Sequence, residues 1–229
     1  GERYPGRLTV VDGDALTANG RTLADNVADA RIADADVIRP YADPLKPAAG
    51  LTVLSGNLFD GAVMKLSVLS DAFRAAYLSD PADPDAFEGT VVVFDGPEDY
   101  HARIDDPALD IDARTILVMR GAGPVGYPGG AEVVNMRPPA ALIRAGVHAL
   151  PCLGDGRQSG TSGSPSILNA APEAAVGGGL VLLRTGDRVR IDLKARRVDA
   201  LLTEAELEER RAALDIASLV PPSQTPWQA

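Results

Sequence analysis

The sequence predicts a single mixed α/β domain. Strand and helix patterns alternate through the middle of the chain, and three strand patterns follow one another after residue 180. Hydrophobic residues make up 45% of the 229 positions, which is enough for a sizeable core. We therefore expect one domain over residues 1–229, with the proline-rich tail 215–229 extended along the surface.

The first half of the chain contains patterns for three strands and two helices. Thr22 and Asp25 have the spacing of a capping box, and Ser70 has the type and position of a helix cap. A proline-rich connector over 33–50 separates the first helix from the second strand. The expected strands cover 7–13, 51–57 and 62–68, and the expected helices cover 22–32 and 70–80.

The second half continues the alternation and ends in strands and one helix. Pro97 suits a first helical position, Gly146 suits a helix stop, and Thr203 forms a capping box with Glu206. A hairpin is expected around Gly186. The expected strands cover 90–94, 114–120, 147–155, the two arms of 180–193, and 196–202, and the helices begin at 97, 138 and 203.

Charge and cysteine content exclude several classes of protein. The formal charge of −10 argues against binding to nucleic acid or to an anionic membrane. No apolar run approaches the ~20 residues of a membrane helix, so we expect a cytoplasmic protein. Cys152 is the only cysteine, so this chain can form no internal disulfide and cannot supply the thiolates of an iron–sulfur cluster. Because it begins at Gly1 without methionine, we expect a processed product or a piece of a longer chain.

The segment "GAGPVG" (121–126) has the glycine spacing of a dinucleotide-binding loop. That loop requires a helix to open within the glycines, so that free N–H groups face the phosphate. Pro124 and Pro128 each lack an N–H, and two more glycines follow them. We therefore expect no helix and no dinucleotide site here.

The segment "GDGRQSGTSGSPS" (154–166) places hydroxyl side chains among glycines, directly after a predicted strand. Ser164 before Pro165 has the pattern of a helix start, so a strand, a loop and a helix are expected to aim N–H groups at an anion or an oxyanion. A polar linker is the alternative. A serine amidase is a third possibility, although the G-x-S-x-G elbow is absent and His101 and His148 are expected to be surface and structural residues.

Glu132 is the second candidate for chemistry. It stands in "YPGGAEVVNM", between glycines and an apolar run, where no solvated helix face explains a carboxylate. Such a residue suits Mg²⁺, which accepts one or two protein carboxylates together with substrate oxygens. A helix-terminal glutamate stabilised by the helix dipole is the other interpretation, and the residues alone leave both open.

Long stretches of the chain resemble one family. The stretches "LSGNLFDGAVMKLS", "VVFDGPEDYHARIDDP", "RGAGPVGYPGGAEVVNMRPPAALI" and "LPCLGDGRQSGTSGSPSILNAAPEAAVGGGLVLLRTGDRVRIDL" are similar to the carboxyl-terminal domain of the dihydroxy-acid and phosphogluconate dehydratases. The resemblance covers residues 20–211. It implies a swivelling β/β/α domain with a mixed, barrel-like sheet and flanking helices. After "DGR", this chain resembles the L-arabinonate and D-xylonate dehydratases more than the branched-chain enzymes.

The resemblance also implies roles for particular residues. A 2,3-dihydroxy acid loses water to give a 2-keto-3-deoxy acid, with Ser159 as base for the C2 proton and Thr161 beside it. Glu132 is implied as a ligand of Mg²⁺, and Gly160 and Ser162 as substrate contacts. The iron–sulfur cluster is held by an amino-terminal domain that this chain lacks, so the chain alone is expected to be inactive and to bind no cluster. The implied partners are that domain, a sugar acid and further copies of the protein.

Two rival functions stay open at this point. One is a non-catalytic module that binds an anion or serves in assembly, with the 154–166 loop as its cradle. The other is a dihydroxy-acid dehydratase of branched-chain amino-acid synthesis. Replacing Ser159 by Ala separates catalysis from binding, because a cradle does not depend on a base.

Overall fold

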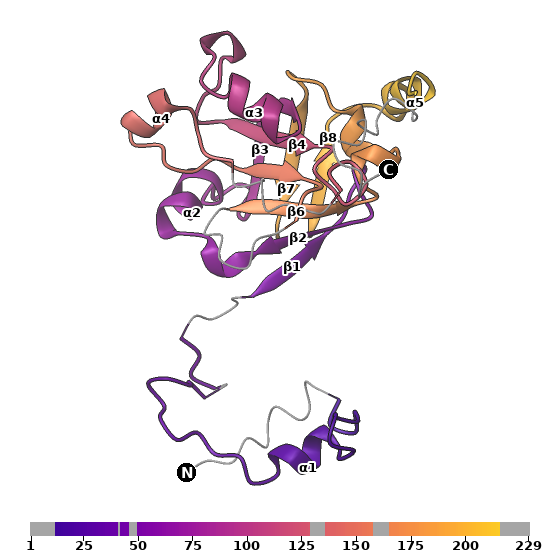
Figure 1. Ribbon diagram of the computed structural model, residues 1–229. Helices are drawn as coiled ribbons and strands as arrows, with labels where there is room; N and C mark the ends of the chain where they lie inside the picture. Colours follow the sequence, from indigo (N-terminus) through magenta and orange to yellow (C-terminus); the bar gives the residue numbers. More distant parts are fainter. Residues whose placement is uncertain (1–11, 41, 46–49, 129–135, 158–164, 216–229) are drawn as a thin grey trace. The chain divides into compact units, whose positions relative to one another are not determined.

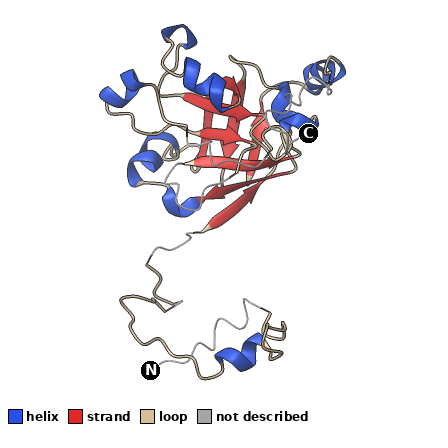
Figure 2. Ribbon diagram, viewed as in Figure 1, coloured by secondary structure: helices blue, strands red, loops and turns tan. Residues whose placement is uncertain are grey.

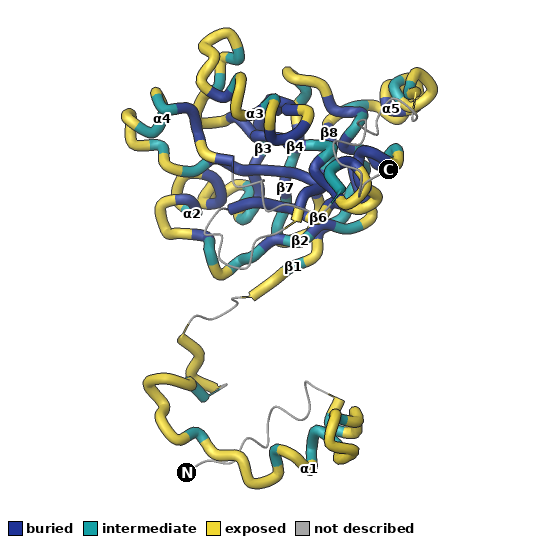
Figure 3. Tube along the Cα trace, in the orientation of Figure 1, coloured by how far each residue is buried: buried dark blue, intermediate teal, exposed yellow. Residues whose placement is uncertain are grey.

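The computed structural model describes residues 12–40, 42–45, 50–128, 136–157 and 165–215. The chain divides into two compact units, 1–48 and 49–229, and each is described by itself. In the first unit, α1 (Leu23–Val27) begins at the predicted capping box of Thr22 and Asp25. None of the described residues of this unit is buried (Figure 3). Across the described ranges, no helix is long and apolar enough to cross a membrane.

The second unit is built on one eight-stranded sheet (Figure 2). Its four central strands, β6, β5, β4 and β3, run parallel, and an antiparallel pair flanks them on each side. The strand order is β1-β2-β6-β5-β4-β3-β7-β8. The strands are β1 (Leu51–Leu54), β2 (Gly61–Lys65), β3 (Ala86–Asp95), β4 (Thr115–Arg120), β5 (Cys152–Gly154), β6 (Ser166–Ala171), β7 (Arg188–Asp192) and β8 (Arg197–Ala200).

The two ends of the sheet meet where β1 passes into the next turn. Ser55 forms a parallel bridge with Arg197, and the Val198 N–H donates to the Ser55 carbonyl at 2.9 Å. The Asn57 side chain exchanges two hydrogen bonds with the backbone of Ala200, at 2.7 and 2.8 Å. These contacts nearly close the sheet into a barrel, which confirms the mixed, barrel-like sheet that the family resemblance implies.

Helices flank the barrel, and three of the four that are described in this unit begin where the sequence predicts; the helix expected to begin at residue 138 begins at Ala140 instead. The Ser70 hydroxyl accepts the Phe73 N–H at 3.1 Å, Pro97 is the first residue of its helix, and Thr203 caps the last helix through the predicted capping box. The α-helices of this unit are α2 (Asp71–Tyr77), α3 (Pro97–Arg103), α4 (Ala140–Arg144) and α5 (Glu204–Ala212) (Figure 1). Single 3₁₀ turns lie at η1 (Leu66–Val68), η2 (Pro107–Leu109), η3 (Ala174–Val176) and η4 (Gly179–Leu182).

The core lies around β3 and β4, whose residues are buried along most of their length (Figure 3). Strands covered on both faces favour continuous apolar runs, which is why "TVVVF" and "TILVM" are correctly predicted as strands. Aromatic pairs attach helices to β3. The Tyr77 ring of α2 meets Phe87 edge-on at 4.9 Å between centroids, and the Tyr100 ring of α3 meets Phe94 at 5.4 Å.

The helix expected after residue 164 is wrong. Ser166–Ala171 forms β6, which lies between β5 and β2, with Ile167 paired to both Leu153 and Met64. Ile167 and Leu168 are both buried, so the strand fills a gap between two existing strands. Local capping signals are weak compared with such burial, and Pro165 is as compatible with a strand start as with a helix start.

The prediction of a hairpin over 180–193 is also wrong, because its first arm is not a strand. Residues 179–182 form the 3₁₀ turn η4, and β7 pairs with β3 and β8 instead, so the hairpin is β7–β8. Leu180, Leu182 and Leu183 are all buried. A strand alternates its faces, whereas the tight turn directs neighbouring leucines into one core.

The candidate active site

The four parallel strands end at one edge of the sheet, here called the carboxyl edge. Their last residues are Asp95, Arg120, Gly154 and Ala171. Ligands of parallel sheets bind beyond this edge, because loops from neighbouring strands start there side by side. The pairing of Met119 with Gly154 puts the ends of β4 and β5 next to each other.

The predicted site residues belong to the two segments that leave this edge from β4 and β5. Glu132 stands in the segment after β4, and Ser159, Gly160, Thr161 and Ser162 stand between β5 and β6. All five lie outside the described residues. Their predicted roles therefore stay predictions, and what the structure describes is the start of each segment.

Asp155, the first residue after β5, anchors these segments. Its side chain is buried, and its two carboxylate oxygens accept three backbone N–H groups. Oδ1 accepts from Ala122 at 2.9 Å, and Oδ2 accepts from Gly121 at 3.0 Å and from Ala174 at 2.9 Å. One carboxylate thus ties together the segments that follow β4, β5 and β6.

Glu173, two residues after β6, makes a second link to the segment after β4. It is 8% exposed, and its Oε1 accepts the Val125 N–H at 2.7 Å. Its Oε2 has no hydrogen-bond partner within the described part of the chain. Burial raises the pKa of Glu173, the charge of Asp155 acts in the same direction, and the Val125 N–H acts against both.

Gly123 lies directly against this carboxylate. A Cβ atom at that position would stand 1.5 Å from Glu173 Oε2 and 2.6 Å from its Cδ. Of the three glycines in 121–126, Gly123 is therefore the one that packing against a buried acid requires. Gly121 has a φ of +73°, and a Cβ at Gly126 would stand 2.8 Å from the Gly121 carbonyl oxygen. No helix begins within 121–128, as predicted, and the Gly121, Ala122 and Val125 N–H groups already bind carboxylates instead of a phosphate.

Arg120, at the end of β4, braces the same edge. Its Nε donates to Asp95 Oδ1 at 2.6 Å, and its Nη1 donates to the carbonyls of Val181 and Leu183, both at 2.8 Å. This cation therefore joins the ends of β3 and β4 to the η4 turn. Because these contacts use its charge, we assign it a structural role.

The described residues do not form a metal site by themselves. Within the described ranges there is no group of three or more His, Cys, Asp or Glu side chains able to hold a metal ion. Asp155 binds backbone N–H donors through both oxygens, and Glu173 does so through Oε1. Cys152 is fully buried in β5, and burial raises the pKa of its thiol to about 12.

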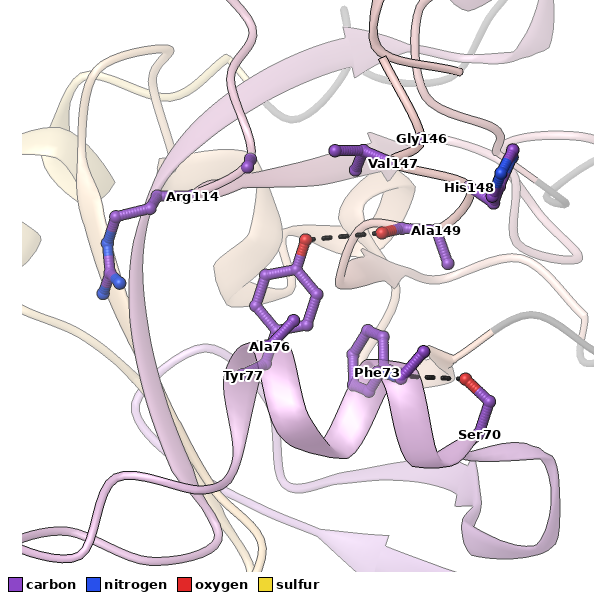
Figure 4. A pocket seen from close by; sticks show the side chains of 11 residues that line it. Ser70, Phe73, Ala76, Tyr77, Arg114, Gly146, Val147, His148 and Ala149 are labelled. Atoms are coloured by element: carbon purple, nitrogen blue, oxygen red, sulfur yellow. Dashed lines mark hydrogen bonds between the residues drawn. The ribbon is translucent and has the colours of Figure 1, made fainter. Parts of the chain in front are cut away.

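The two histidines lie away from the carboxyl edge or on the surface. His101 is exposed on α3, as predicted. His148 lines a cavity of about 310 Å³ between α2 and the residues that precede β4 and β5, at the opposite edge of the parallel strands (Figure 4). Phe73 and Tyr77 supply much of its wall, and the Tyr77 hydroxyl donates to the Ala149 carbonyl at 3.3 Å.

Sequence reasoning missed the roles of Asp155 and Glu173. Asp155 lies inside the "GDGR" stretch that draws attention for its later hydroxyls, and Glu173 stands alone between an apolar strand and a glycine run in "AAPEAAVGGG". An isolated acid in an apolar context is a usable signal, because burial of a carboxylate requires hydrogen-bond donors. The donors lie 33, 34 and 48 residues before the acids they bind, and Ala174 lies 19 residues after Asp155, so the sequence could not identify them.

The chain matches the family described as Dihydroxy-acid/6-phosphogluconate dehydratase C-terminal over residues 36–228. It is 56% identical over 216 residues to a D-xylonate dehydratase of Caulobacter vibrioides, covering 94% of this chain and 36% of that protein. It is 42% identical over 203 residues to an L-arabonate dehydratase of Azospirillum brasilense, covering 88% and 33%. It is 38% identical over 209 residues to a dihydroxy-acid dehydratase of Ignicoccus hospitalis, covering 90% and 35%. The chain thus spans about a third of the length of these curated relatives.

Proposed function

Because this chain belongs to the dihydroxy-acid/6-phosphogluconate dehydratase family, we propose that it is the carboxyl-terminal part of a sugar-acid dehydratase. The observation that carries this choice is the identity of 56% to a D-xylonate dehydratase, against 37%, 38% and 40% to three dihydroxy-acid dehydratases over similar lengths. The substrate class is then an aldonate such as D-xylonate or L-arabinonate.

The proposed reaction removes water from C2 and C3 of the acid. Ser159 Oγ, as an alkoxide, takes the C2 proton and the C3–O bond breaks. The leaving hydroxide takes a proton from the Ser159 hydroxyl and departs as water, which restores the alkoxide. The resulting enol becomes the 2-keto-3-deoxy acid when C3 gains a proton. Thr161 lies two residues from the base, and Gly160 and Ser162 contact the substrate in this proposal.

A serine hydroxyl is a weak base, so the proposal requires cations nearby. Mg²⁺ held in part by Glu132 would stabilise negative charge on the substrate carboxylate and C2 oxygen, and an iron–sulfur cluster held by the amino-terminal part would polarise the C3 hydroxyl. The described residues contain no group of three or more metal-ligating side chains, so in this proposal the remaining ligands belong elsewhere in the longer protein.

Strand order supports the proposal. The segments that carry Glu132 and Ser159 leave neighbouring parallel strands at one edge, and Asp155 binds the first residues of one to the start of the other. Ser159 follows Asp155 by four residues, so chain length alone keeps their Cα atoms within about 14 Å. The single carboxyl-terminal domain over 1–229, its extended tail, a homo-oligomer and a cytoplasmic location are further parts of this proposal.

The test uses the longer protein that contains this chain. The purified protein is incubated with D-xylonate, L-arabinonate, D-gluconate and 2,3-dihydroxyisovalerate, and 2-keto acid formation is measured. We expect turnover of an aldonate and about a 1,000-fold loss in Ser159→Ala, because removing a proton-transfer group costs this much. Ser79→Ala, just after α2 at the opposite edge, is the matched control.

Each outcome has a distinct meaning. Turnover of 2,3-dihydroxyisovalerate alone would assign the branched-chain reaction instead. Near-normal turnover in Ser159→Ala would reject the proposed base and favour an anion cradle. The 229-residue chain by itself is expected to show neither turnover nor the absorbance bands of an iron–sulfur cluster.

A further inference from the structure

Asp155 and Glu173 are two buried acids to which the proposed reaction gives no part. Together they accept four backbone N–H groups, three of which come from the segment 121–125 after β4. Neither acid has a salt-bridge partner among the described arginines, lysines and histidines. Burying two carboxylates without a cation is costly, so a gain other than attraction between opposite charges must offset it.

We propose that Asp155 and Glu173 are positioning residues that hold the segment 121–127 in one conformation for the dehydration proposed above, on which this inference rests. The segment has three glycines and would otherwise sample many conformations, because glycine restricts the backbone least. The carboxylates bind its N–H groups at both ends of a short turn, at Gly121 and Ala122 and again at Val125.

The hold matters because the proposed metal ligand lies further along the same segment. Glu132 comes five residues after Tyr127 in the sequence, so in this proposal the conformation of 121–127 limits where that ligand can lie. The Tyr127 N–H donates to the Gly123 carbonyl at 2.7 Å, so the ordered turn extends to residue 127. Displacements of about 1 Å in a catalytic constellation can reduce turnover about 100-fold.

The two carboxylates differ in whether a side-chain amide can keep their hydrogen bonds. Asp155 accepts on both oxygens, so Asp155→Asn leaves an NH₂ facing an N–H on one side. Glu173 accepts the Val125 N–H on Oε1, the Gly126 N–H also lowers its pKa, and its Oε2 has no partner among the described residues, so Glu173→Gln can keep the bond to Val125. The proposal therefore predicts rescue by the conservative change at Glu173 and failure at Asp155.

The first experiment measures amide hydrogen exchange in the chain itself. In Asp155→Asn the remaining oxygen keeps two donors, Gly121 and Ala174, if the NH₂ takes the place of Oδ1. We therefore expect exchange about tenfold faster at Ala122 in Asp155→Asn and at Val125 in Glu173→Ala, with wild-type rates in Glu173→Gln, because each lost bond frees one buried N–H. Asp112→Ala is the matched control, since Asp112 accepts the Arg114 N–H at 2.8 Å at the other end of β4. Unchanged exchange rates in all variants would show that the two carboxylates do not hold the segment 121–127 in one conformation.

The second experiment measures kcat and KM of the longer protein on its aldonate. We expect kcat to fall about 100-fold in Asp155→Asn and Glu173→Ala and to stay near wild type in Glu173→Gln and Asp112→Ala. If Asp155→Asn does not fold, the comparison of kcat between Glu173→Ala and Glu173→Gln tests the positioning role. Normal kcat in Glu173→Ala would overturn the positioning role while leaving the dehydratase intact. A wild-type protein that dehydrates no acid would instead overturn the proposed function, and the catalytic part of this inference with it.

Discussion

Replacing Gly123 by Ala tests the packing of the segment after β4 against Glu173. The new Cβ would stand 1.5 Å from Glu173 Oε2, a distance that no non-bonded pair tolerates, so the carboxylate or the segment must move. Either movement breaks the hydrogen bond from the Val125 N–H to Glu173. The backbone of Gly123 is not in the left-handed region, so the cost is steric and not conformational.

The magnitude follows from three contributions. A buried donor left without its acceptor costs about 1–3 kcal/mol. Overpacking costs about 1–3 kcal/mol. Removing a glycine stabilises by about 0.4–1 kcal/mol, because the unfolded chain loses freedom. We expect Gly123→Ala to lower the free energy of unfolding by about 3 kcal/mol.

A double-mutant cycle attributes this loss to the contact with Glu173. Glu173→Ala removes the atoms at 1.5 and 2.6 Å and leaves only its Cβ, 2.9 Å from the new methyl group, which a shift of a few tenths of an ångström relieves. The double variant should therefore be about 2 kcal/mol more stable than the sum of the single losses implies.

Urea unfolding followed by far-ultraviolet circular dichroism measures all three variants. Gly61→Ala is the matched control, because its Cβ would meet only Val53 Cγ1 at an ordinary 3.7 Å. Losses at Gly123 and Glu173 that add within about 0.5 kcal/mol would refute the described contact.

Three further outcomes are expected. Burial raises the pKa of Glu173 above its ordinary value of 4.5, so between these two pKa values the folded state keeps a proton that the unfolded chain has lost. The free energy of unfolding should therefore fall as pH rises from 4.5 through the folded pKa. Urea unfolding at several pH values measures this slope, and Glu173→Gln should lack it. The hydrogen bond from Arg103 lowers the pKa of Asp99 below its ordinary 3.8. The ionised Asp99 therefore stabilises the fold above pH 3.8, and this stabilisation is lost as pH falls through the folded pKa. Asp99→Asn should be less stable at pH 7, and its free energy of unfolding should depend less on pH in the acid range. Arg210→Ala should cost about 2 kcal/mol in thermal unfolding, because it leaves the Asp187 side chain, which is only 10% exposed, without its cation, and an unchanged melting temperature would contradict the role of this pair in attaching α5.

The sequence predicts helix starts correctly where a short pattern of residues has one physical interpretation. The capping boxes at Thr22 and Thr203, the cap at Ser70 and the proline at the start of α3 were all predicted correctly. Each satisfies free N–H groups within one helical turn, so neighbours in sequence decide it. The absence of a helix in 121–126 follows in the same way from Pro124.

The wrong predictions of secondary structure concern segments whose conformation depends on strands that are distant in the sequence. Residues 166–171 carry a helix-start signal, yet they form β6 because β5 and β2 leave a strand-wide gap that Ile167 and Leu168 fill. The first arm of the expected hairpin is η4 for a similar reason, since β7 finds its partner in β3. Burial against an existing sheet outweighs local propensity.

By itself, the sequence determined the family, the α/β class, most of the elements and the two segments in which chemistry is expected, because these depend on motifs and on neighbours along the chain. Only the tertiary structure decided that the strands close into a barrel through Ser55 and Arg197 and that Asp155 and Glu173 bind the segment after β4. Both depend on groups that are many residues apart. A buried carboxylate is stabilised by whichever N–H groups the fold brings to it, and no periodicity in the sequence records which ones those are.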